Sequence, residues 1–361
     1  MHGCFLDASK AFDRVNHSLL FRKLLQRHLS PVVVRILLSW YMNQRATVLW
    51  NGSLSHKFSI SNGVRLGGVL SPILFTIYID DLLVELEKQG VGCFWRHFFV
   101  GAVCYADDIA LIAPSQSALR LMLRTCSEFA SSHSLIFNTS KTQLIEFSCC
   151  PSSRCGLADF SFNGEKLRYL KTVRHLGHIL SNDLSDNPDI IAVKQSMCRK
   201  ANHMLTVFGS CDPHTKSKLM QSFCLSLYGS ALWAASSSEL HSLAVSFNNI
   251  LRKIWSLPRR CHTAILHCVG GLQGIHNIVI TRSNKLISSA LKAGSCLLAE
   301  VFTEASTLMY TSFGYNHCNA ARHWKSYSEC DKLCANFIRD ARLNPELNNH
   351  LLEDINYMCC T

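Results

Sequence analysis

The sequence predicts an α+β fold in which a strand-containing first half is followed by an almost wholly helical second half. Short apolar runs separated by tight turns alternate with helical patterns up to about residue 180. Beyond residue 190, apolar residues recur almost throughout at helical spacing. Of the 361 residues, 48% are hydrophobic and 17% are charged. The chain can therefore bury a real core, and its length suggests two or three domains.

The first elements are a strand and two helices. The string "GCFLDASKAFDRV" starts as a strand and turns into a helix, and helical patterns follow at roughly 17–28 and 31–44. The strings "ATVLWNG" and "HKFSISNGV" then predict a hairpin with Asn51-Gly52 in its turn, because this dipeptide favours the two-residue turns of hairpins.

A longer helix is predicted after the structure-breaking Gly67-Gly68. Ser71 is a natural N-cap, Pro72 a natural first helical residue, and Gly90 ends the element. A second strand–turn–strand covers about Phe98 to Ala113. The remaining predicted elements are a helix at 115–132, a turn and strand in "FNTSKTQLIEFS", and short strands around Asn163-Gly164 and Leu176-Gly177.

The positive charge of the chain is concentrated in one region. The formal net charge is +11, and residues 190–299 contain twelve Lys or Arg against two acidic residues, so this region carries +10. A regional basic surplus of this kind is expected of a nucleic-acid-binding face. The alternative is a set of helices whose basic faces are simply solvated.

The 18 cysteines do not indicate a disulfide scaffold, because the chain is long, the spacings are irregular and no secretory signal is visible. We expect reduced thiols, an intracellular protein and no disulfide-linked partner. The longest apolar runs are interrupted by Arg, Asp or His, so no transmembrane helix is predicted. Scattered helix-surface residues, rather than a metal cluster, are predicted for His317, Cys318, His323, Cys330 and Cys334.

Two Tyr-x-Asp-Asp strings occur, and their surroundings differ. "YIDD" at 78–81 lies in a helical stretch, so we interpret its aspartates as ordinary surface charge. "YADD" at 105–108 lies between two apolar β-rich runs, where a tight turn would carry the aspartates out of the core. Unpaired charges are costly in a dry interior, so this pair calls for a partner such as a metal ion.

A third carboxylate, Asp7, ends the predicted strand "CFLD" and would lie beside this turn if the two strands are neighbours. Aspartates on adjacent strand ends supply the oxygen ligands that hard divalent ions prefer. Paired ions of this type align the attacking and leaving oxygens in phosphoryl transfer.

Five motifs in this order resemble those of reverse transcriptases from non-LTR retrotransposons, especially the jockey-like mobile-element group. They are "FLDASKAFDRVNH", "GVRLGGVLSP", "YADDIALIAPS", "FNTSKT" and "RHLGHIL". The resemblance implies a polymerase palm, with a ferredoxin- or RRM-like antiparallel sheet and helices on one face. It also implies three parts along the chain. Residues 1–185 would form the palm, with residual fingers elements at 14–60. Residues 186–275 would form a helical basic thumb-like domain, and residues 276–361 a C-terminal helical region.

The resemblance also implies roles for individual residues. Metal ligation falls to Asp7 and Asp107, with Asp108 weaker or orienting, and Lys141 is a candidate general acid. Phe12 would be an aromatic gate against a ribose 2′-hydroxyl, with Leu66 and Gly67 beside it at the nucleotide. Primer and template would be contacted by Tyr105, Ala106, Ser71, Pro72, His175, Leu176 and Gly177. Independently, the basic region makes Arg252, Lys253, Arg259 and Arg260 candidates for backbone contacts.

The implied activity is RNA-directed DNA polymerisation by two-metal nucleotidyl transfer to a primer 3′-hydroxyl. It would require two Mg²⁺ ions, with Mn²⁺ as a substitute, an RNA template, a DNA primer and deoxynucleoside triphosphates. The expected location is the cytoplasm or nucleus, in a ribonucleoprotein and away from membranes.

Three departures from the family leave an alternative open. Leu66 stands where the family usually has Gln, and the family's upstream fingers and N-terminal endonuclease are absent, which predicts a truncated reading frame. The alternative is an inactive remnant that only binds nucleic acid. A maturase-type reverse transcriptase is a second alternative, disfavoured by the absence of a distinct maturation domain.

Overall fold

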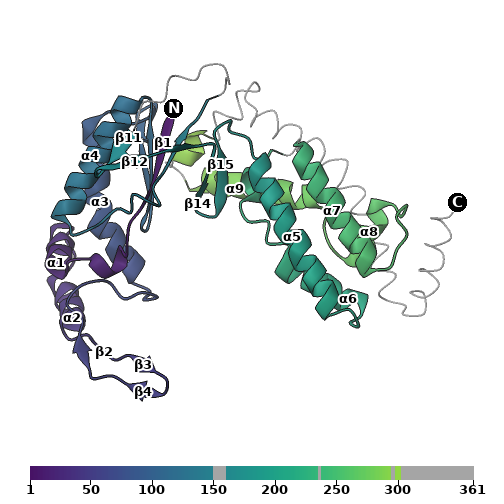
Figure 1. Cartoon of the computed structure of the whole chain (residues 1–361), viewed down its shortest axis with the longest axis horizontal. Coiled ribbons are helices and arrows are strands. Elements are labelled where there is room, and N and C mark those ends of the chain that lie inside the picture. The colour runs from purple at the N-terminus through teal and green to yellow at the C-terminus, as the bar shows by residue number, and fades with distance from the viewer. Residues whose placement is uncertain (149–159, 235–236, 294–296, 302–361) are drawn as a thin grey trace. The chain divides into compact units, whose positions relative to one another are not determined.

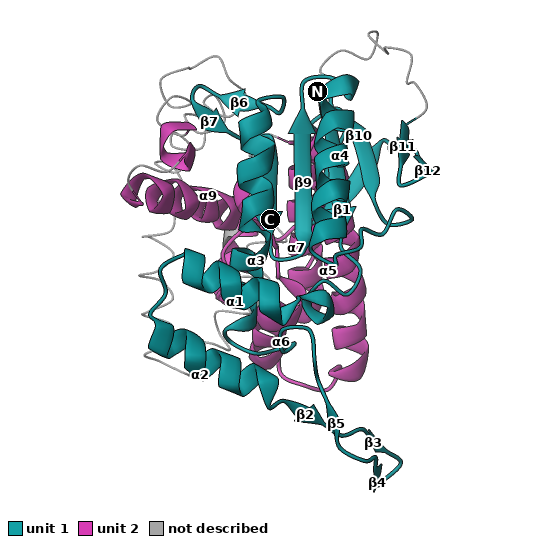
Figure 2. Ribbon diagram, turned by 90° about the vertical axis from the view of Figure 1, so that its left-hand side faces the viewer, with its two compact units in different colours: residues 1–176, 180–184 teal, residues 177–179, 185–361 magenta. Residues whose placement is uncertain are grey.

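The computed structural model describes residues 1–148, 160–234, 237–293 and 297–301. The chain divides into two compact units, which Figure 2 shows in different colours. Unit 1 comprises residues 1–176 and 180–184, and unit 2 comprises residues 177–179 and 185–361.

Unit 1 is built on a five-stranded sheet with strand order β13-β10-β1-β9-β8. The pairs are antiparallel except for β10 with β13. The first strand of the chain is therefore the central strand of the sheet. The strands are β1 (His2–Asp7), β8 (Ala102–Tyr105), β9 (Asp108–Ala113), β10 (Gln143–Glu146) and β13 (Tyr169–Leu170).

In the described part of unit 1, four α-helices accompany this sheet. They are α1 (His17–Gln26), α2 (Pro31–Met42), α3 (Ser71–Gln89) and α4 (Gln116–Ser132), and a short 3₁₀ helix spans Phe12–Arg14. The side chains of Asn16 and Ser115 cap α1 and α4 by accepting a hydrogen bond from a first-turn backbone N–H. Gly90 ends α3 in the left-handed conformation, as the sequence predicts.

The sheet has two different faces because successive side chains of a strand alternate. Cys4, Leu6 and Ile109 belong to the main core with the helices, whereas Phe5 and Ile145 join a smaller cluster on the other face. Figure 2 shows α3 and α4 running alongside β1 and β9. One face of the sheet is thus packed against helices. On the other face, residues of the 172–181 hairpin pack against the smaller cluster.

The remaining strands of the described residues form short two-stranded sheets. They pair β2 (Arg45–Ala46) with β5 (Phe58–Ser59), β3 (Leu49–Trp50) with β4 (Ser53–Leu54), β6 (Phe94–Trp95) with β7 (Phe98–Phe99), β11 (Phe160–Phe162) with β12 (Glu165–Leu167), and β14 (Thr172–His175) with β15 (His178–Ser181). Asn51 and Gly52 both have positive φ, so the predicted Asn-Gly hairpin turn is confirmed (Figure 1).

Unit 2 is helical where it is described, apart from residues 177–179. Its helices are α5 (Asn187–Val207), α6 (Pro213–Leu219), α7 (Ser238–Ile254), α8 (Thr263–Gly270) and α9 (Ile275–Lys292), with a π-helical turn at Met220–Cys224 and a 3₁₀ helix at Ser230–Leu232. Ile275 and Val279 share a buried core with residues of α5 and α7.

Within the described ranges, no helix is both long and apolar enough to cross a membrane. The cysteines described there are free thiols. The histidines and cysteines at 317, 318, 323, 330 and 334 lie outside the described residues.

Candidate active site at the ends of strands β1 and β9

Three aspartates lie at one end of the central strands. Strand β1 ends at Asp7, and β9 begins at Asp108, which is paired with Asp7 in the antiparallel register. Directly opposed residues project from the same face of such a pair and lie close together. The predicted position of Asp7 beside the Asp-Asp turn is therefore confirmed by the strand pairing.

A two-residue turn carries the third aspartate. Tyr105 pairs with Asp108, so Ala106 and Asp107 form the turn between β8 and β9. Only Ala106 has a positive φ, +53°, the sign pattern of a type II′ turn. Because that position suits glycine, an alanine there is strained by about 1–3 kcal/mol. The turn is thus held in an unfavourable conformation that lifts Asp107 away from the apolar strands.

The negative charges of Asp7 and Asp108 act on Asp107. The pKa of Asp107 is raised above its usual value, first by burial and then by the negative charges of Asp108 and Asp7. A hydrogen bond to its own backbone opposes the shift. A nearby cation would relieve this repulsion, and carboxylate oxygens are the ligands that Mg²⁺ prefers. The chemistry of the donor set therefore fits a divalent ion.

The side chains are not gathered around a common point. Among the residues that the structure describes, no three His, Cys, Asp or Glu side chains are arranged to hold a metal ion. Lys141 Nζ lies 3.5 Å from Asp7 Oδ2, in an ion pair between two exposed side chains.

The loop before β10 brings Lys141 to Asp7. The Asn138 backbone N–H donates to the Asp7 carbonyl at 2.8 Å, which ties the loop to the end of β1. The side chain of Asn138 accepts from the Ser140 backbone, and Thr142 closes the turn by donating to the Asn138 carbonyl. The string "FNTSKT" is thus a hydrogen-bonded turn that sets Lys141 beside the aspartates.

Phe12 is held by aromatic stacking. Its ring is half-buried and stacks on Phe75 of α3, with ring centroids 4.9 Å apart. The Val64 backbone N–H donates to the Phe12 carbonyl at 2.8 Å. The 3₁₀ helix after β1 is therefore fixed to the segment that leads into α3.

The segment before α3 departs from its prediction at Ser71. The helix begins at Ser71 itself, Leu70 is the N-cap, and the Ser71 hydroxyl donates to the Arg65 carbonyl instead of capping the helix. Ser71 is buried, whereas Pro72 and Leu66 are exposed, and 76% of Leu66 is accessible. Gly67 has a φ of +76°, so the loop depends on glycine there.

The turn between β14 and β15 lies at Leu176 and Gly177, both with positive φ. Before it, the His175 ring lies on the Phe5 ring with centroids 4.7 Å apart. The pKa of His175 is lowered by burial and raised to a lesser extent by the charge of Asp108. On the sheet face opposite the helices, His175 therefore lies within the electrostatic reach of Asp108.

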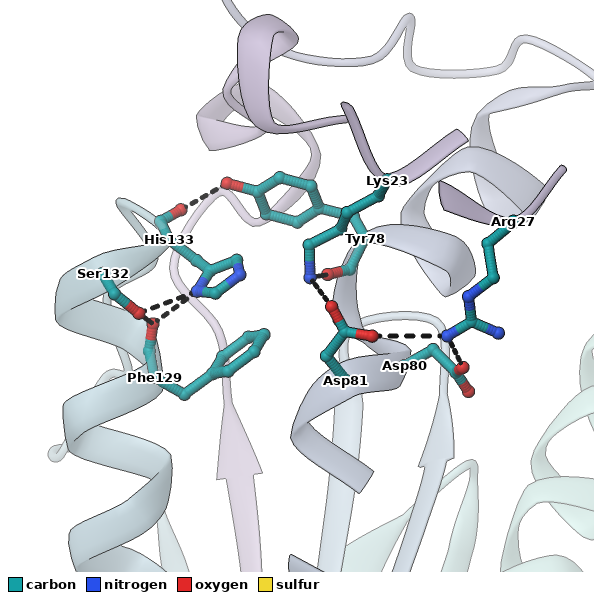
Figure 3. Close-up of polar contacts among 8 residues, drawn as sticks. All are labelled: Lys23, Arg27, Tyr78, Asp80, Asp81, Phe129, Ser132 and His133. Atoms are coloured by element: carbon teal, nitrogen blue, oxygen red, sulfur yellow. Dashed lines mark hydrogen bonds and ion pairs between the residues drawn. The ribbon is translucent and has the colours of Figure 1, made fainter. Parts of the chain in front are cut away.

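The helical "YIDD" string is not ordinary surface charge, and that interpretation is wrong. Figure 3 shows that Asp81 accepts a hydrogen bond from Lys23 Nζ at 2.6 Å, and Asp80 pairs with Arg27. The Lys23 side chain is only 6% exposed, and its Nζ also donates to the Tyr78 carbonyl. These aspartates tie α1 to α3, so their role in the described structure is to stabilise unit 1.

One of the four predicted backbone-binding cations differs from the other three in accessibility. Arg259 and Arg260 are exposed, as is Lys253, whereas Arg252 is half-buried. The Arg252 guanidinium donates to the Asn249 side chain and to the Cys261 carbonyl, each at 3.0 Å. Arg252 is thus engaged inside unit 2, and only the other three are presented to solvent.

The sequence did not predict the role of Asp189, a buried carboxylate in unit 2. Asp189 is 5% exposed and accepts hydrogen bonds from the Ile179 backbone and the Trp233 indole, and it pairs with His178 at 3.1 Å. These groups come from three separate stretches of chain. No local spacing signals such a cluster, so only the fold reveals it.

Comparison with known proteins identifies the first half of the chain. The family model "Reverse transcriptase (RNA-dependent DNA polymerase)" matches residues 1–180. The RNA-directed DNA polymerase from mobile element jockey of Drosophila funebris is 26% identical over 281 residues, which cover 73% of this chain and 29% of that protein. The Pol polyprotein from the type-2 retrotransposable element R2DM of Drosophila melanogaster is 29% identical over 150 residues, covering 42% of this chain and 14% of that protein.

The chain thus spans less than a third of the length of either relative. Among solved structures, a telomerase from Candida tropicalis in complex with the TWJ fragment of telomeric RNA has a TM-score of 0.41 and 14% identity, covering 84% of this chain and 48% of that one.

Proposed function

Residues 1–180 belong to the reverse transcriptase family, and from this premise we propose that the chain is the RNA-directed DNA polymerase module of a non-LTR retrotransposon. The observation that carries the proposal is the strand pairing that sets Asp7 opposite Asp108, with Asp107 in the adjoining turn. The partners are an RNA template, a DNA primer and deoxynucleoside triphosphates, and the protein acts inside the cell.

The proposed reaction joins the primer 3′-oxygen to the α-phosphorus of a nucleotide and releases pyrophosphate. Asp7 and Asp107 would hold two divalent ions, Mg²⁺ or Mn²⁺, with Asp108 in support. When bound, such ions stabilise the charge that develops on the attacking and leaving oxygens. Lys141 Nζ lies at this site and would donate a proton to the departing pyrophosphate; its pairing with Asp7 supports this role.

The other residues would orient the substrates. Phe12, backed by Phe75, would press against the sugar of the nucleotide and disfavour a 2′-hydroxyl. The exposed Tyr105 and the 175–177 turn would contact the primer strand. The first half would be a palm and the helical unit a thumb that follows the nucleic-acid backbone.

Primer extension tests the proposal. The full chain is incubated with poly(rA)/oligo(dT) and labelled dTTP, with Mg²⁺ or Mn²⁺, and the expected result is extension that stops when the ion is chelated. Salt-dependent binding of the hybrid without extension in either ion would overturn the polymerase proposal. It would instead support the alternative, a protein that only binds nucleic acid, which the apolar and exposed Leu66 favours.

Restoring an amide at position 66 should improve nucleotide use. In the chain fused to a related fingers domain, Leu66→Gln is expected to lower the apparent KM for nucleotide by roughly two- to tenfold, the scale of one hydrogen bond. Steady-state extension assays measure it. Val69→Gln, 91% exposed in the same loop, is the matched control. An unchanged KM for Leu66→Gln, or an equal gain in both variants, would contradict the assigned role.

Removing the exposed cations of unit 2 should weaken nucleic-acid binding on all sequences alike. Changing Lys253, Arg259 and Arg260 to Gln, with Arg252 kept for its internal hydrogen bonds, is expected to flatten the slope of log K against log salt by about 0.7–0.9 for each lost phosphate contact. Fluorescence anisotropy of an RNA–DNA hybrid over a range of salt concentrations measures this slope.

The matched control removes three exposed charges from unit 1, at Arg22, Lys57 and Lys88. If the two triple variants change the slope equally, the effect reflects net charge alone. The thumb-like role of the basic region would then be wrong.

A further inference from the structure

A cavity in unit 2 is lined by cations and amides and lies outside the aspartate site. Its volume is about 500 Å³, and it is bordered by the π-helical turn, the loop after α8 and the side of α9. Pockets of this volume accommodate small ligands, and π-helical turns occur frequently at functional sites. The lining includes Gln221, Leu272, Gln273, Thr281, Arg282 and Lys285, and it contains no carboxylate.

The guanidinium of Arg282 is held in a fixed position. Its Nη1 donates to the carbonyls of Ser226 and Leu227 and to the Ser230 hydroxyl. Its Nε and Nη2 have no such partner among the described residues, and neither atom is both buried and unsatisfied. One edge of the guanidinium thus anchors the loop, while the other edge can donate to a ligand in the cavity.

Lys285 supplies a second charge to the same wall. It lies three residues after Arg282 on α9, so the two side chains leave the helix on the same side. Lys285 is exposed and forms no ion pair with a described residue. The amides of Gln221 and Gln273 and the hydroxyl of Thr281 add neutral polar groups, and the buried Leu272 adds an apolar surface.

These groups match a terminal nucleotide with a phosphomonoester. Such a group carries a charge of about −1.5 to −2, close to that of the two cations, whereas a diester inside a strand carries −1. Arg donates to phosphate in a fixed, two-pronged geometry, and glutamine amides hydrogen-bond to base edges. A concave cavity of this volume receives the end of a strand more readily than an internal nucleotide with neighbours on both sides.

We propose that this cavity binds the 5′-phosphorylated end of a nucleic-acid strand, with Arg282 and Lys285 on the phosphate. The site is distinct from the aspartate site and does not depend on polymerase activity. A free mononucleotide offers the same chemistry, so the experiment separates the two sources.

Binding of two single-stranded RNA oligonucleotides of one sequence tests the proposal. One carries a 5′-phosphate and the other a 5′-hydroxyl, and fluorescence anisotropy with the full chain gives both dissociation constants. The phosphorylated strand is expected to bind about tenfold more tightly, the scale of charge-assisted hydrogen bonds. Lys285→Gln should reduce that ratio toward one, and Thr281→Leu, which fills the cavity and removes the hydroxyl, should do the same.

Lys292→Gln is the matched control, because Lys292 is exposed on the last turn of the same helix and does not line the cavity. It should keep the ratio, and unchanged circular dichroism should show that the variants fold. Equal binding of the two strands by the natural chain, or equal loss in the Lys285 and Lys292 variants, would overturn the proposal. If 5′-AMP displaces the phosphorylated strand with an affinity equal to the strand's own, the ligand is a free nucleotide and the strand-end assignment is wrong.

Discussion

Asp107→Asn is expected to reduce primer extension by roughly 10²–10³-fold, the loss seen when one preorganised electrostatic group is removed from an active site. Asparagine keeps the size of the side chain but loses the charge that would hold a cation. The fold of the turn should persist, because the Ala106–Asp107 turn is closed by the pairing of Tyr105 with Asp108. Asp7→Asn should lose activity on the same scale.

The chain contains its own control for this prediction. Asp80→Asn changes the corresponding residue of the helical Tyr-x-Asp-Asp string, where the carboxylate pairs with Arg27. It should retain extension activity. Mn²⁺ binding, followed by electron paramagnetic resonance, gives a readout that does not require turnover and should weaken in Asp107→Asn alone. Equal behaviour of the two variants would contradict the site.

Asp81→Ala is expected to lower the free energy of unfolding by about 1–3 kcal/mol, because it leaves the buried Lys23 ammonium without its counter-charge, a carboxylate whose side chain is 46% exposed. Lys23 would keep only the Tyr78 carbonyl and the rings of Tyr78 and Phe129. Urea unfolding followed by circular dichroism measures the change.

Two further variants identify the cause. Asp80→Ala removes an exposed pairing with Arg27 and should cost less than about 1 kcal/mol. The double variant Lys23→Met/Asp81→Ala should recover most of the loss, because no buried charge remains. If the double variant is as unstable as Asp81→Ala, the loss comes from packing rather than from an unpaired charge.

This ion pair also makes stability depend on pH. Burial raises the pKa of Asp81, but the hydrogen bonds and charges of Lys23 and Arg27 outweigh it, so the net pKa is lowered. A lowered folded-state pKa means that the contribution is present above the unfolded pKa and is lost as pH falls through the folded pKa. Acid unfolding of Asp81→Ala should therefore be less steep in that range.

Local signals in the sequence predicted the elements and much of the site. The "YADD" turn is recognisable because its apolar flanks leave no place for two carboxylates in the core, and the Asn51-Gly52 turn because both positions need positive φ. The adjacency of Asp7 required only that two predicted strands be neighbours. The information for the two turns lies within a few residues, whereas the adjacency of Asp7 depends on a non-local pairing of strands.

What could not be predicted depends on contacts between distant segments. Lys23 and Asp81 are 58 residues apart in the sequence. No residue near "YIDD" indicates that Asp81 pairs with a buried lysine. In the sequence, nothing distinguishes Arg252 from the other basic residues around it. In the structure, its guanidinium donates a hydrogen bond to the Cys261 carbonyl. Ser71 is a residue type that commonly caps helices, but its hydroxyl donates a hydrogen bond to the Arg65 carbonyl instead.

The central position of β1 also has a kinetic consequence. Its partners are β9 and β10, and the register pairs Asp7 with Asp108 and His2 with Glu146. A ribosome therefore makes the middle strand of the sheet more than a hundred residues before either neighbour. Non-local pairing of this kind slows folding, since long loops must close before any strand contact forms. The apolar β1 would wait unpaired during synthesis, so chaperone binding to the nascent chain should fall once residue 146 has emerged.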